Sequence, residues 1–484
     1  MHPADMIFFW AEMYPHHPAL LQPNASLTYR ELAIAITGIS QRTDALKLPK
    51  DEPVAVAIDE PMRRLAVCFA LLRRGIPVAP IRPTMLPLMR ANGIPNTIYT
   101  GHGQVLSGGR NIRFEESWLR LADGPVERWN PGDASLAADT SQIFFTSGTT
   151  GVPKKVVVPG AAIMERVALL GYTAEALTDR TLVVPGVSSW FGFSRTAQLM
   201  HAGRTVCTAG DIEGTLRMID LFEVETIIAS PQQILALVNA VDANPALQPA
   251  SLQQVVMGGA FASPELFRRV QARLCRNVVY NYGSTEAGLV ASGNYFAIQS
   301  ISNAVGFPAP GITVEIVDEQ GRPLPAGTPG RIRCRTNYFA AGYIAAHPEA
   351  RDDVETIWWY PGDNGLLTEG GVLCVLGRTD DVVNIGGTKV AGALLDEAAQ
   401  RTPGVSDAGV CGVPGSSGIE ELWVAVVLDR QANIADVRQA LSGRAEFAGV
   451  QFNMVAVDEL PRNDLGKLER YKIKQLLVAK MKQP

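Results

Sequence analysis

The sequence is poor in residues arranged for metal or thiol chemistry. Its six cysteines are dispersed and form no CxxC pair, so we expect neither a disulfide framework nor a zinc site. The six histidines form no HExxH motif, which disfavours a transition metal held by the protein. No GxSxG motif occurs either, and this absence disfavours a Ser-His-Asp hydrolase built on that turn.

Long apolar runs and an excess of one charge are also missing. The longest apolar runs, such as residues 65–72, are much shorter than the roughly 20 residues that span a bilayer. The 43 basic and 48 acidic residues give a net charge of −5 without long like-charge runs, which argues against nucleic acid as a partner. The first residues show no export signal. We therefore expect a cytoplasmic protein with neither a membrane nor a nucleic-acid partner.

Among the 484 residues, apolar runs typical of buried strands alternate with helical patterns, which indicates parallel sheets in an α/β architecture. The predicted strands include residues 54–58, 181–184, 226–229, 254–257 and 277–280, and the predicted helices include residues 231–241 and 264–274. From about Gly306 turn-rich β segments dominate, and after Arg378 a compact α+β pattern follows. We predict a large N-terminal domain over residues 1–379, with a β subdomain at about 306–378, and a small C-terminal domain over residues 380–484.

One segment carries a strong chemical signal. It consists of six small or hydroxyl-bearing residues followed closely by Lys154, and it reads Thr146-Ser147-Gly148-Thr149-Thr150-Gly151. Glycines let backbone N–H groups face an anion, hydroxyl groups add donors, and lysine adds positive charge. The segment lacks the spacing of a Walker A loop and lies between two predicted strands, residues 142–145 and 156–158. We interpret it as a phosphate-binding loop carried by a hairpin.

This loop resembles the phosphate-loop signature of the adenylate-forming superfamily, which includes acyl- and aryl-CoA synthetases, peptide-synthetase adenylation domains and luciferases. Six further segments resemble motifs of that family in the same order: residues 27–32 (LTYxEL), Gly258-Gly259-Ala260 (GGA), residues 281–286 (NxYGxTE), Pro361-Gly362-Asp363 (PGD), residues 377–381 (GRxDD) and residues 461–467 (PRxxxGK). The resemblance therefore covers nearly the whole chain. It implies an α/β fold with a large N-terminal domain of stacked sheet and helix subdomains, a β subdomain, and a mobile α+β C-terminal domain that carries the catalytic lysine.

The resemblance implies a role for each motif residue in binding ATP. The loop over residues 146–154 would hold the β- and γ-phosphates. Glu286 would hold Mg²⁺, and Thr285 would contact the α-phosphate. Lys467 would reach the α-phosphate and the substrate carboxylate during adenylation. Asp363 would accept hydrogen bonds from the ribose hydroxyls, with Arg378 beside it. The remaining residues implied for the nucleotide site are Gly259, Ala260, Asn281, Tyr282 and Gly283.

The same resemblance assigns three further segments. Asp380 would be the hinge between an adenylating pose and a thioester-forming pose, and Gly386 and Gly387 would line a pantetheine tunnel in the second pose. The acyl pocket would be lined by Ser188, Ser189, Trp190, Phe191 and Gly258. Serine stands in this segment where the family frequently has histidine. The family's relation between pocket residues and substrate therefore does not carry over to this chain. The aromatic side chains beside the small Gly258 indicate an aromatic or medium-chain acid.

These observations predict an ATP-dependent carboxylic acid–CoA ligase. The acid and ATP would form an acyl-AMP and pyrophosphate, and the acyl group would then pass to a thiol, with Mg²⁺ as cofactor and ATP and CoA as co-substrates. One alternative is a stand-alone ligase that loads the pantetheine thiol of a carrier protein. Another is a non-catalytic nucleotide-binding or regulatory protein that keeps the fold. The presence of Lys467, Glu286 and Asp363 counts against this last alternative.

Overall fold

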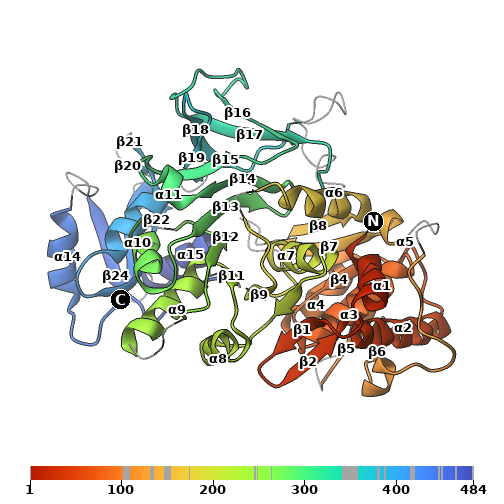
Figure 1. Ribbon diagram of the computed structural model, residues 1–484. Coiled ribbons are helices and arrows are strands. Elements are labelled where there is room, and N and C mark those ends of the chain that lie inside the picture. The colour runs from red at the N-terminus through yellow and green to blue at the C-terminus, as the bar shows by residue number, and fades with distance from the viewer. Residues whose placement is uncertain are drawn as a thin grey trace.

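The structure, a computed structural model, describes residues 2–101, 109–130, 136–146, 154–173, 175–244, 247, 249–262, 264–340, 358–378, 382–385, 388–414, 420–444, 447, 451–463 and 466–481. The N-terminal elements, the central sheet and the C-terminal elements follow one another across the molecule (Figure 1). Among the described residues, no helix combines the length and the apolar character that crossing a membrane requires.

The N-terminal part contains a sheet of six strands. They are β3 (Val54–Ala57), β4 (Val78–Pro80), β5 (Asn96–Tyr99), β6 (Arg110–Arg113), β7 (Ser141–Thr146) and β8 (Lys154–Pro159). Their order across the sheet is β6-β5-β3-β4-β7-β8, and all neighbours are parallel except the β7–β8 hairpin. Strands therefore flank the glycine-rich loop on both sides, as the sequence predicted. The short elements η1 (Pro83–Met85), α4 (Leu86–Met89), η2 (Arg90–Asn92), η3 (Glu116–Leu119) and α5 (Leu136–Asp139) lie between these strands in the chain.

Helices α1 (Pro3–Met13), α2 (Tyr29–Leu46) and α3 (Pro61–Arg73) pack together beside this sheet. Thr28 and Glu31 of the LTYxEL motif form a capping box that begins α2, since each side chain accepts a hydrogen bond from the other residue's backbone N–H. The motif therefore has a structural role here, because it fixes where a long helix starts.

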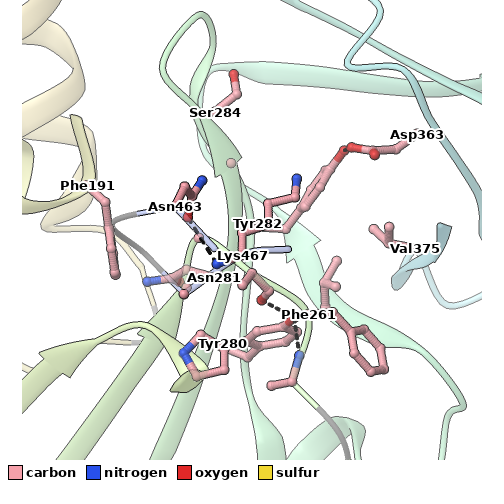
Figure 2. A pocket seen from close by; sticks show the side chains of 18 of the residues that line it. Phe191, Phe261, Tyr280, Asn281, Tyr282, Ser284, Asp363, Val375, Asn463 and Lys467 are labelled. Atoms are coloured by element: carbon pink, nitrogen blue, oxygen red, sulfur yellow. Dashed lines mark hydrogen bonds between the residues drawn. The ribbon is translucent and has the colours of Figure 1, made fainter. Parts of the chain in front are cut away.

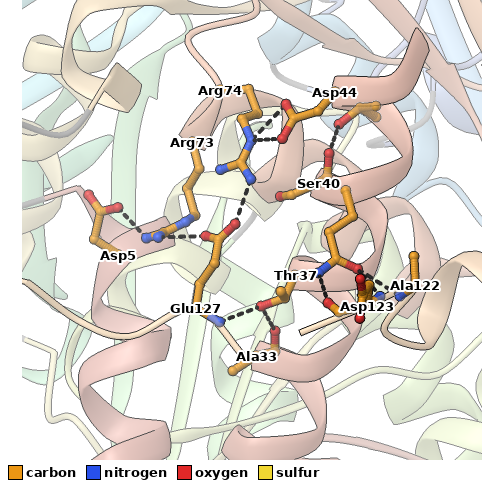
Figure 3. A network of polar contacts seen from close by, with 12 residues as sticks. Asp5, Ala33, Thr37, Ser40, Asp44, Arg73, Arg74, Ala122, Asp123 and Glu127 are labelled. Carbon is orange, nitrogen blue, oxygen red and sulfur yellow. Dashed lines mark hydrogen bonds and ion pairs between the residues drawn. The ribbon is translucent and has the colours of Figure 1, made fainter. Parts of the chain in front are cut away.

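A network of ion pairs links these three helices (Figure 3). Arg73 on α3 lies 2.6 Å from Asp5 on α1 and 3.0 Å from Glu127. Its neighbour Arg74 lies 2.5 Å from Glu127 and 2.9 Å from Asp44 on α2. Single exposed ion pairs contribute little, but all of these side chains except Asp44 are largely shielded, and both arginines share the carboxylate of Glu127, so they act as a network. The network lies outside the cavity described below.

A second sheet of thirteen strands forms the centre of the molecule. Its parallel part contains β1 (Pro18–Gln22), β9 (Arg180–Val183), β10 (Thr205–Cys207), β11 (Thr226–Ala229), β12 (Gln254–Gly258) and β13 (Val278–Ser284), and β2 (Ala25–Thr28) pairs with β1 at one edge. The strands β9, β11, β12 and β13 lie within one residue of the predicted runs, apart from the C-terminal extension of β13, whereas β10 was not predicted. Helices around this part are α6 (Gly160–Leu170), α7 (Trp190–His201), α8 (Ile212–Phe222), α9 (Pro231–Ala243) and α10 (Pro264–Arg273).

The other half of this sheet is antiparallel. It contains β14 (Gly288–Asn294), β15 (Ala304–Pro308), β16 (Ile312–Val317), β17 (Gly330–Thr336), β18 (Asp363–Leu367) and β19 (Leu373–Arg378), and the short helix α11 (Tyr295–Ile298) joins β14 to β15 in the chain. Strands β16 to β19 lie within the bounds of about 306–378 given for the β subdomain, whereas β14 precedes them, and the subdomain itself stays a prediction. Strand β15 pairs with β14 on one side and β19 on the other, so this region continues the central sheet by hydrogen bonding.

The C-terminal elements build two small sheets with their own apolar clusters. Strands β20 (Val382–Ile385) and β21 (Thr388–Ala391) form a hairpin, and β22 (Val405–Pro414), β23 (Glu420–Leu428) and β24 (Phe452–Ala456) form a three-stranded sheet. The helices are α13 (Gly392–Gln400), α14 (Ile434–Ser442) and α15 (Arg470–Met481). This is the predicted α+β pattern. The division at Thr379–Asp380 stays a prediction, because both residues lie outside the described part of the chain.

Candidate active site

A cavity of about 1090 Å³ lies where the central sheet, α7, α9 and the segment before α15 meet. Strand β13 runs along it and carries three consecutive polar side chains, Tyr280, Asn281 and Tyr282. Because successive side chains on a strand point to opposite faces, Asn281 and Tyr282 lie on different sides of β13. Figure 2 shows Asn281 directed toward Phe191 and Tyr282 directed toward Asp363. The strand thus separates the cavity into two sides.

On one side, three predicted residues form a hydrogen-bonded group. The hydroxyl of Tyr282 donates to Oδ2 of Asp363 at 2.5 Å. Asp363 and Arg378 are direct cross-strand partners of β18 and β19, and Nε of Arg378 lies 3.3 Å from Oδ1 of Asp363. Burial and the neighbouring Asp363 carboxylate raise the pKa of Tyr282 well above its usual 10, so the hydroxyl stays a donor.

The GGA turn follows β12 and is fixed by Tyr280. The Tyr280 hydroxyl donates to the carbonyl of Ala260 at 3.0 Å and accepts from the backbone N–H of Ala262 at 3.1 Å. Gly259 has φ +84°, a left-handed conformation that favours glycine. A side chain at Gly258 would lie 3.2 Å from the ring of Phe191. The turn therefore lies close against the aromatic wall of the cavity.

Lys467 reaches the same cavity from the C-terminal segment (Figure 2). Its backbone N–H donates to Oδ1 of Asn463 at 3.0 Å, and the backbone N–H of Asn463 donates to its carbonyl at 2.9 Å. Gly466 lies directly against α9, since a Cβ atom at Gly466 would be 2.3 Å from Cβ of Gln232. This contact places the C-terminal segment beside the central sheet.

Thr285 and Glu286 follow β13 and are anchored through their backbone. Arg166 on α6 donates to the carbonyls of Thr285 at 2.9 Å, Glu286 at 2.5 Å and Tyr338 at 3.0 Å. Its guanidinium also lies 4.7 Å from the ring of Trp190. Burial lowers the pKa of Arg166 to about 9. Sequence reasoning missed this residue, because a single arginine in a helical pattern carries no signal of the distant carbonyls that it binds.

Glu286 is the carboxylate that fits the expected Mg²⁺. It lines the same cavity as Thr146 and Lys154, which are register partners at the end of the β7–β8 hairpin. Among the described residues there is no group of three His, Cys, Asp or Glu side chains that could hold a metal alone. A single carboxylate suits Mg²⁺, because this ion takes most of its ligands from phosphates and water when it binds a nucleotide.

On the other side of β13, the predicted acyl-pocket residues Ser188, Ser189, Trp190 and Phe191 line the cavity. Ser189 is also the N-cap of α7, where its hydroxyl accepts from the N–H of Gly192 at 3.1 Å and donates to the carbonyl of Gly186 at 2.9 Å. Its hydroxyl is therefore engaged in starting the helix.

Several predicted residues lie outside the described part of the chain. They are the loop residues Ser147, Gly148, Thr149, Thr150 and Gly151, the hinge Asp380, and the pantetheine-tunnel glycines Gly386 and Gly387. The residues predicted for the nucleotide site that the structure describes and brings together in the lining of this cavity are Thr146, Lys154, Gly259, Ala260, Tyr282, Gly283, Thr285, Glu286, Asp363, Arg378 and Lys467. Asn281 also lines the cavity, and its side chain is directed toward Phe191 (Figure 2). The roles of these residues stay predictions.

Comparison with known proteins shows which enzymes this chain is similar to. The family described as AMP-binding enzyme matches residues 109–344. A 4-chlorobenzoate–CoA ligase from an Arthrobacter species is 26% identical over 503 residues, which cover 98% of this chain and 95% of that protein. Both matches support the placement of this chain in the adenylate-forming superfamily. The resemblance seen in the sequence, and the α/β fold class inferred from it, are thereby confirmed.

Other similar proteins differ in length from this chain. The phosphinothricin tripeptide synthetase PhsC of Streptomyces viridochromogenes is 27% identical over 496 residues, which cover 95% of this chain but 44% of that protein. The solved structure of the o-succinylbenzoate CoA synthetase MenE from Bacillus subtilis, in complex with its acyl-adenylate intermediate, superposes with a TM-score of 0.83 at 19% identity and covers 97% of this chain and 98% of that one. Together the relatives support an AMP-forming acid–thiol ligase that uses ATP and Mg²⁺.

Proposed function

We propose that this protein is an ATP-dependent carboxylic acid–CoA ligase. In the first step a carboxylate attacks the α-phosphate of ATP and releases pyrophosphate, and in the second the thiol of CoA displaces AMP to give a thioester. The observation that carries the proposal is that Lys467, from the C-terminal segment, lines one cavity with Asp363 and Glu286 of the central sheet. These side chains are supplied by segments far apart in the sequence.

The proposed roles follow from the charges involved. Both reactants of the first step are anions, so fixed cations and donors near the α-phosphate lower the barrier. Lys467 supplies that charge, and Glu286 holds Mg²⁺ on the phosphates. Asp363, oriented by Tyr282 and Arg378, accepts from the ribose hydroxyls. The backbone of Thr285, fixed by Arg166, sets the position of its side chain next to the α-phosphate.

The β7–β8 hairpin is the proposed carrier of the triphosphate. Thr146 and Lys154 stand opposite each other at its end and both line the cavity. The intervening loop, rich in glycine and hydroxyl groups, would close on the β- and γ-phosphates. The turn Gly259-Ala260 and the residue Gly283 near the end of β13 would flank the adenine. The reaction would take place in the cytoplasm, as the sequence led us to expect.

CoA is the proposed acceptor of the acyl group. The match to the 4-chlorobenzoate–CoA ligase extends over 95% of that relative, whereas the match to PhsC is to a part of a longer peptide synthetase. Gly386 and Gly387 are proposed to line the path of the pantetheine arm. Loading of a carrier protein remains the second candidate, and the peptide-synthetase relatives are what favour it.

Two assays on the full chain test the proposal. Exchange of labelled pyrophosphate into ATP, driven by a panel of aromatic and medium-chain acids, measures the first step, and we expect exchange with at least one acid. Thioester formation with free CoA, compared with carrier proteins bearing pantetheine, measures the second. No exchange with any acid would contradict the proposal and favour a non-catalytic nucleotide-binding protein. If the acyl group passes only to a carrier protein, the proposed first step still holds, and the acceptor is the carrier protein instead of CoA.

A further inference from the structure

The acyl side of the cavity contains a buried polar cluster that the roles above do not use. Arg195 on α7 lies 2.7 Å from Glu175, and the two side chains are 2% and 4% exposed. The same oxygen of Glu175 accepts a hydrogen bond from Nδ2 of Asn281 at 2.7 Å. Arg195 and Asn281 both line the cavity, and the Arg195 guanidinium lies 5.8 Å from the ring of Phe191.

This cluster holds Asn281 away from the nucleotide. Tyr282, the next residue on β13, bonds to Asp363 on the opposite side of the strand. Because neighbouring side chains on a strand point to opposite faces, the amide of Asn281 belongs to the acyl side. The amide N–H of Asn281 is thus engaged by Glu175, and the nucleotide role that the NxYGxTE resemblance implied for Asn281 stays a prediction.

Arg195 also donates from Nη1 to Oε1 of Gln198 at 3.3 Å, but two polar atoms of the cavity-lining residues Arg195 and Asn281 have no hydrogen-bond partner among the described residues. They are Nε of Arg195 and Oδ1 of Asn281, and both are buried. One is a donor and the other an acceptor. Buried polar atoms in native proteins are almost always paired, and an unpaired one calls for an explanation. Both residues line the cavity, although the two atoms themselves are covered, so a group on the bound acid would pair with them after a small shift of either side chain.

The charges indicate which group this is. Glu175 neutralises Arg195, so the cluster offers no net positive charge to a second carboxylate. Arg166, the other buried arginine of the cavity, already donates to three backbone carbonyls. A hydroxyl group both donates and accepts, so it can satisfy Oδ1 of Asn281 and Nε of Arg195 together. The ring of Phe191 next to the cluster suits an aromatic body on the same molecule.

We propose that the acyl pocket selects an aromatic carboxylic acid that bears a hydroxyl group remote from the reacting carboxylate, with Arg195 and Asn281 as the residues that determine this specificity. The inference rests on the proposed function, and it narrows the substrate class of that same site. The sequence indicated only an aromatic or medium-chain acid, because neither Arg195 nor Glu175 belongs to a motif.

The test compares acids that differ only in the group that reaches the cluster. Pyrophosphate release by the wild-type chain is measured with the 3- and 4-hydroxy forms of benzoic and cinnamic acid, with their methyl isosteres, and with 4-carboxybenzoic acid. We expect kcat/KM for the best hydroxy acid to exceed that of its methyl isostere by about 10- to 100-fold, because the isostere leaves the buried atoms unpaired. This measurement needs no variant and is independent of any effect of mutation on folding.

A double variant then assigns the preference to the cluster. Arg195→Met combined with Glu175→Gln removes both charges together, so neither is left alone in the interior. The matched control is Arg180→Met combined with Glu223→Gln, the same substitutions in an ion pair of 3.6 Å outside the cavity. We expect the first double variant to use the hydroxy acid and its methyl isostere about equally, and the control to keep the wild-type preference.

The outcomes separate this inference from the function on which it rests. A wild-type preference for a methyl- or carboxy-substituted acid overturns the inference while pyrophosphate release still supports the ligase. A hydroxyl preference that survives in the first double variant overturns the role of Arg195 in the same way. Absence of pyrophosphate release with every acid overturns the proposed function, and the inference with it. Binding of ATP to each variant, measured by titration calorimetry, verifies that the nucleotide side is intact.

Discussion

Lys467 is held at the cavity by the short segment before α15, and its proposed task is confined to the first half-reaction. We expect Lys467→Ala to slow acyl-AMP formation by about 10²- to 10³-fold, the effect of losing one preorganised donor to developing charge. Thioester formation from supplied acyl-AMP should change much less, because this lysine is proposed to leave the site when the C-terminal part turns. The two half-reactions are measured separately, by pyrophosphate exchange and by thioester release.

Lys480→Ala is the matched control for this variant. Lys480 lies on α15, donates to the carbonyl of Ala456 and does not line the cavity. Its removal should leave both half-reactions at wild-type rates. Equal losses in the two half-reactions of Lys467→Ala would show that Lys467 supports the structure of the domain and does not act on the α-phosphate.

Tyr282 acts on the nucleotide through Asp363. Tyr282→Phe removes the hydroxyl that donates to Asp363 and leaves the ring in place. A hydrogen bond to a charged group is worth about 1.5–3 kcal/mol, so we expect KM for ATP to rise about 10- to 100-fold with little change in kcat. Because the pKa of Tyr282 is raised well above 10, the hydroxyl stays protonated, and the ratio of the two KM values should not vary between about pH 6 and pH 9.

The control for Tyr282→Phe is Tyr172→Phe, at a side chain that is 76% exposed. Its KM for ATP should equal that of the wild type. A fall in kcat with unchanged KM in Tyr282→Phe would indicate that the hydroxyl acts in the transition state instead of positioning Asp363.

At the scale of elements, the contact between Gly466 and α9 holds the C-terminal segment in place. Gly466 has φ +74°, and a Cβ atom there would meet Cβ of Gln232 at 2.3 Å. Gly466→Ala should therefore displace Lys467 from the cavity and lower the rate of pyrophosphate exchange by about 10²-fold, the effect of a misplacement of about 1 Å. Adding Gln232→Gly should restore part of the rate by removing the steric contact, but not the part due to backbone strain.

Gly443→Ala is the matched glycine control. Gly443 follows α14 with φ −80°, and the nearest atom to a Cβ there is at 3.5 Å, an ordinary contact. We expect this variant to exchange pyrophosphate at the wild-type rate. If Gly466→Ala also did so, the contact with Gln232 would not belong to the pose in which acyl-AMP forms.

Local patterns were sufficient to predict several strands of the two larger sheets and the helices α9 and α10. Strands such as β11 and β12 are short apolar runs bounded by turns, and their character does not depend on distant partners. The pairing of β15 with both β14 and β19 could not be read from the sequence, because strand register depends on segments far along the chain. The same limit applies to the site. Tyr282, Asp363 and Lys467 belong to motifs, whereas Arg166, Glu175 and Arg195 are recognisable only once their burial and partners are seen.

At the scale of the whole molecule, the C-terminal elements have apolar clusters separate from those of the central sheet. Their contacts with the rest of the chain include Gly466 against Gln232 and α13 against β19. A unit with its own core and a limited interface can turn as a body when its linker permits. We therefore propose that the arrangement seen here, with Lys467 in the cavity, is the pose for acyl-AMP formation, and that a rotation near Asp380 brings the thioester-forming pose.

Asp380→Pro tests that rotation. Proline fixes φ near −65° and restricts the preceding residue, here Thr379, so the substitution should obstruct a change of backbone conformation at the proposed hinge. The variant removes no residue proposed to contact phosphate, so pyrophosphate release should continue, limited to the acyl-AMP that stays bound. Thioester formation should fall about 10-fold or more, because turnover then depends on a motion that proline hinders. Asp380→Ala does not restrict the backbone, so its rate of thioester formation should fall less than that of Asp380→Pro. If both half-reactions keep wild-type rates in the proline variant, the second step does not require rotation at this position.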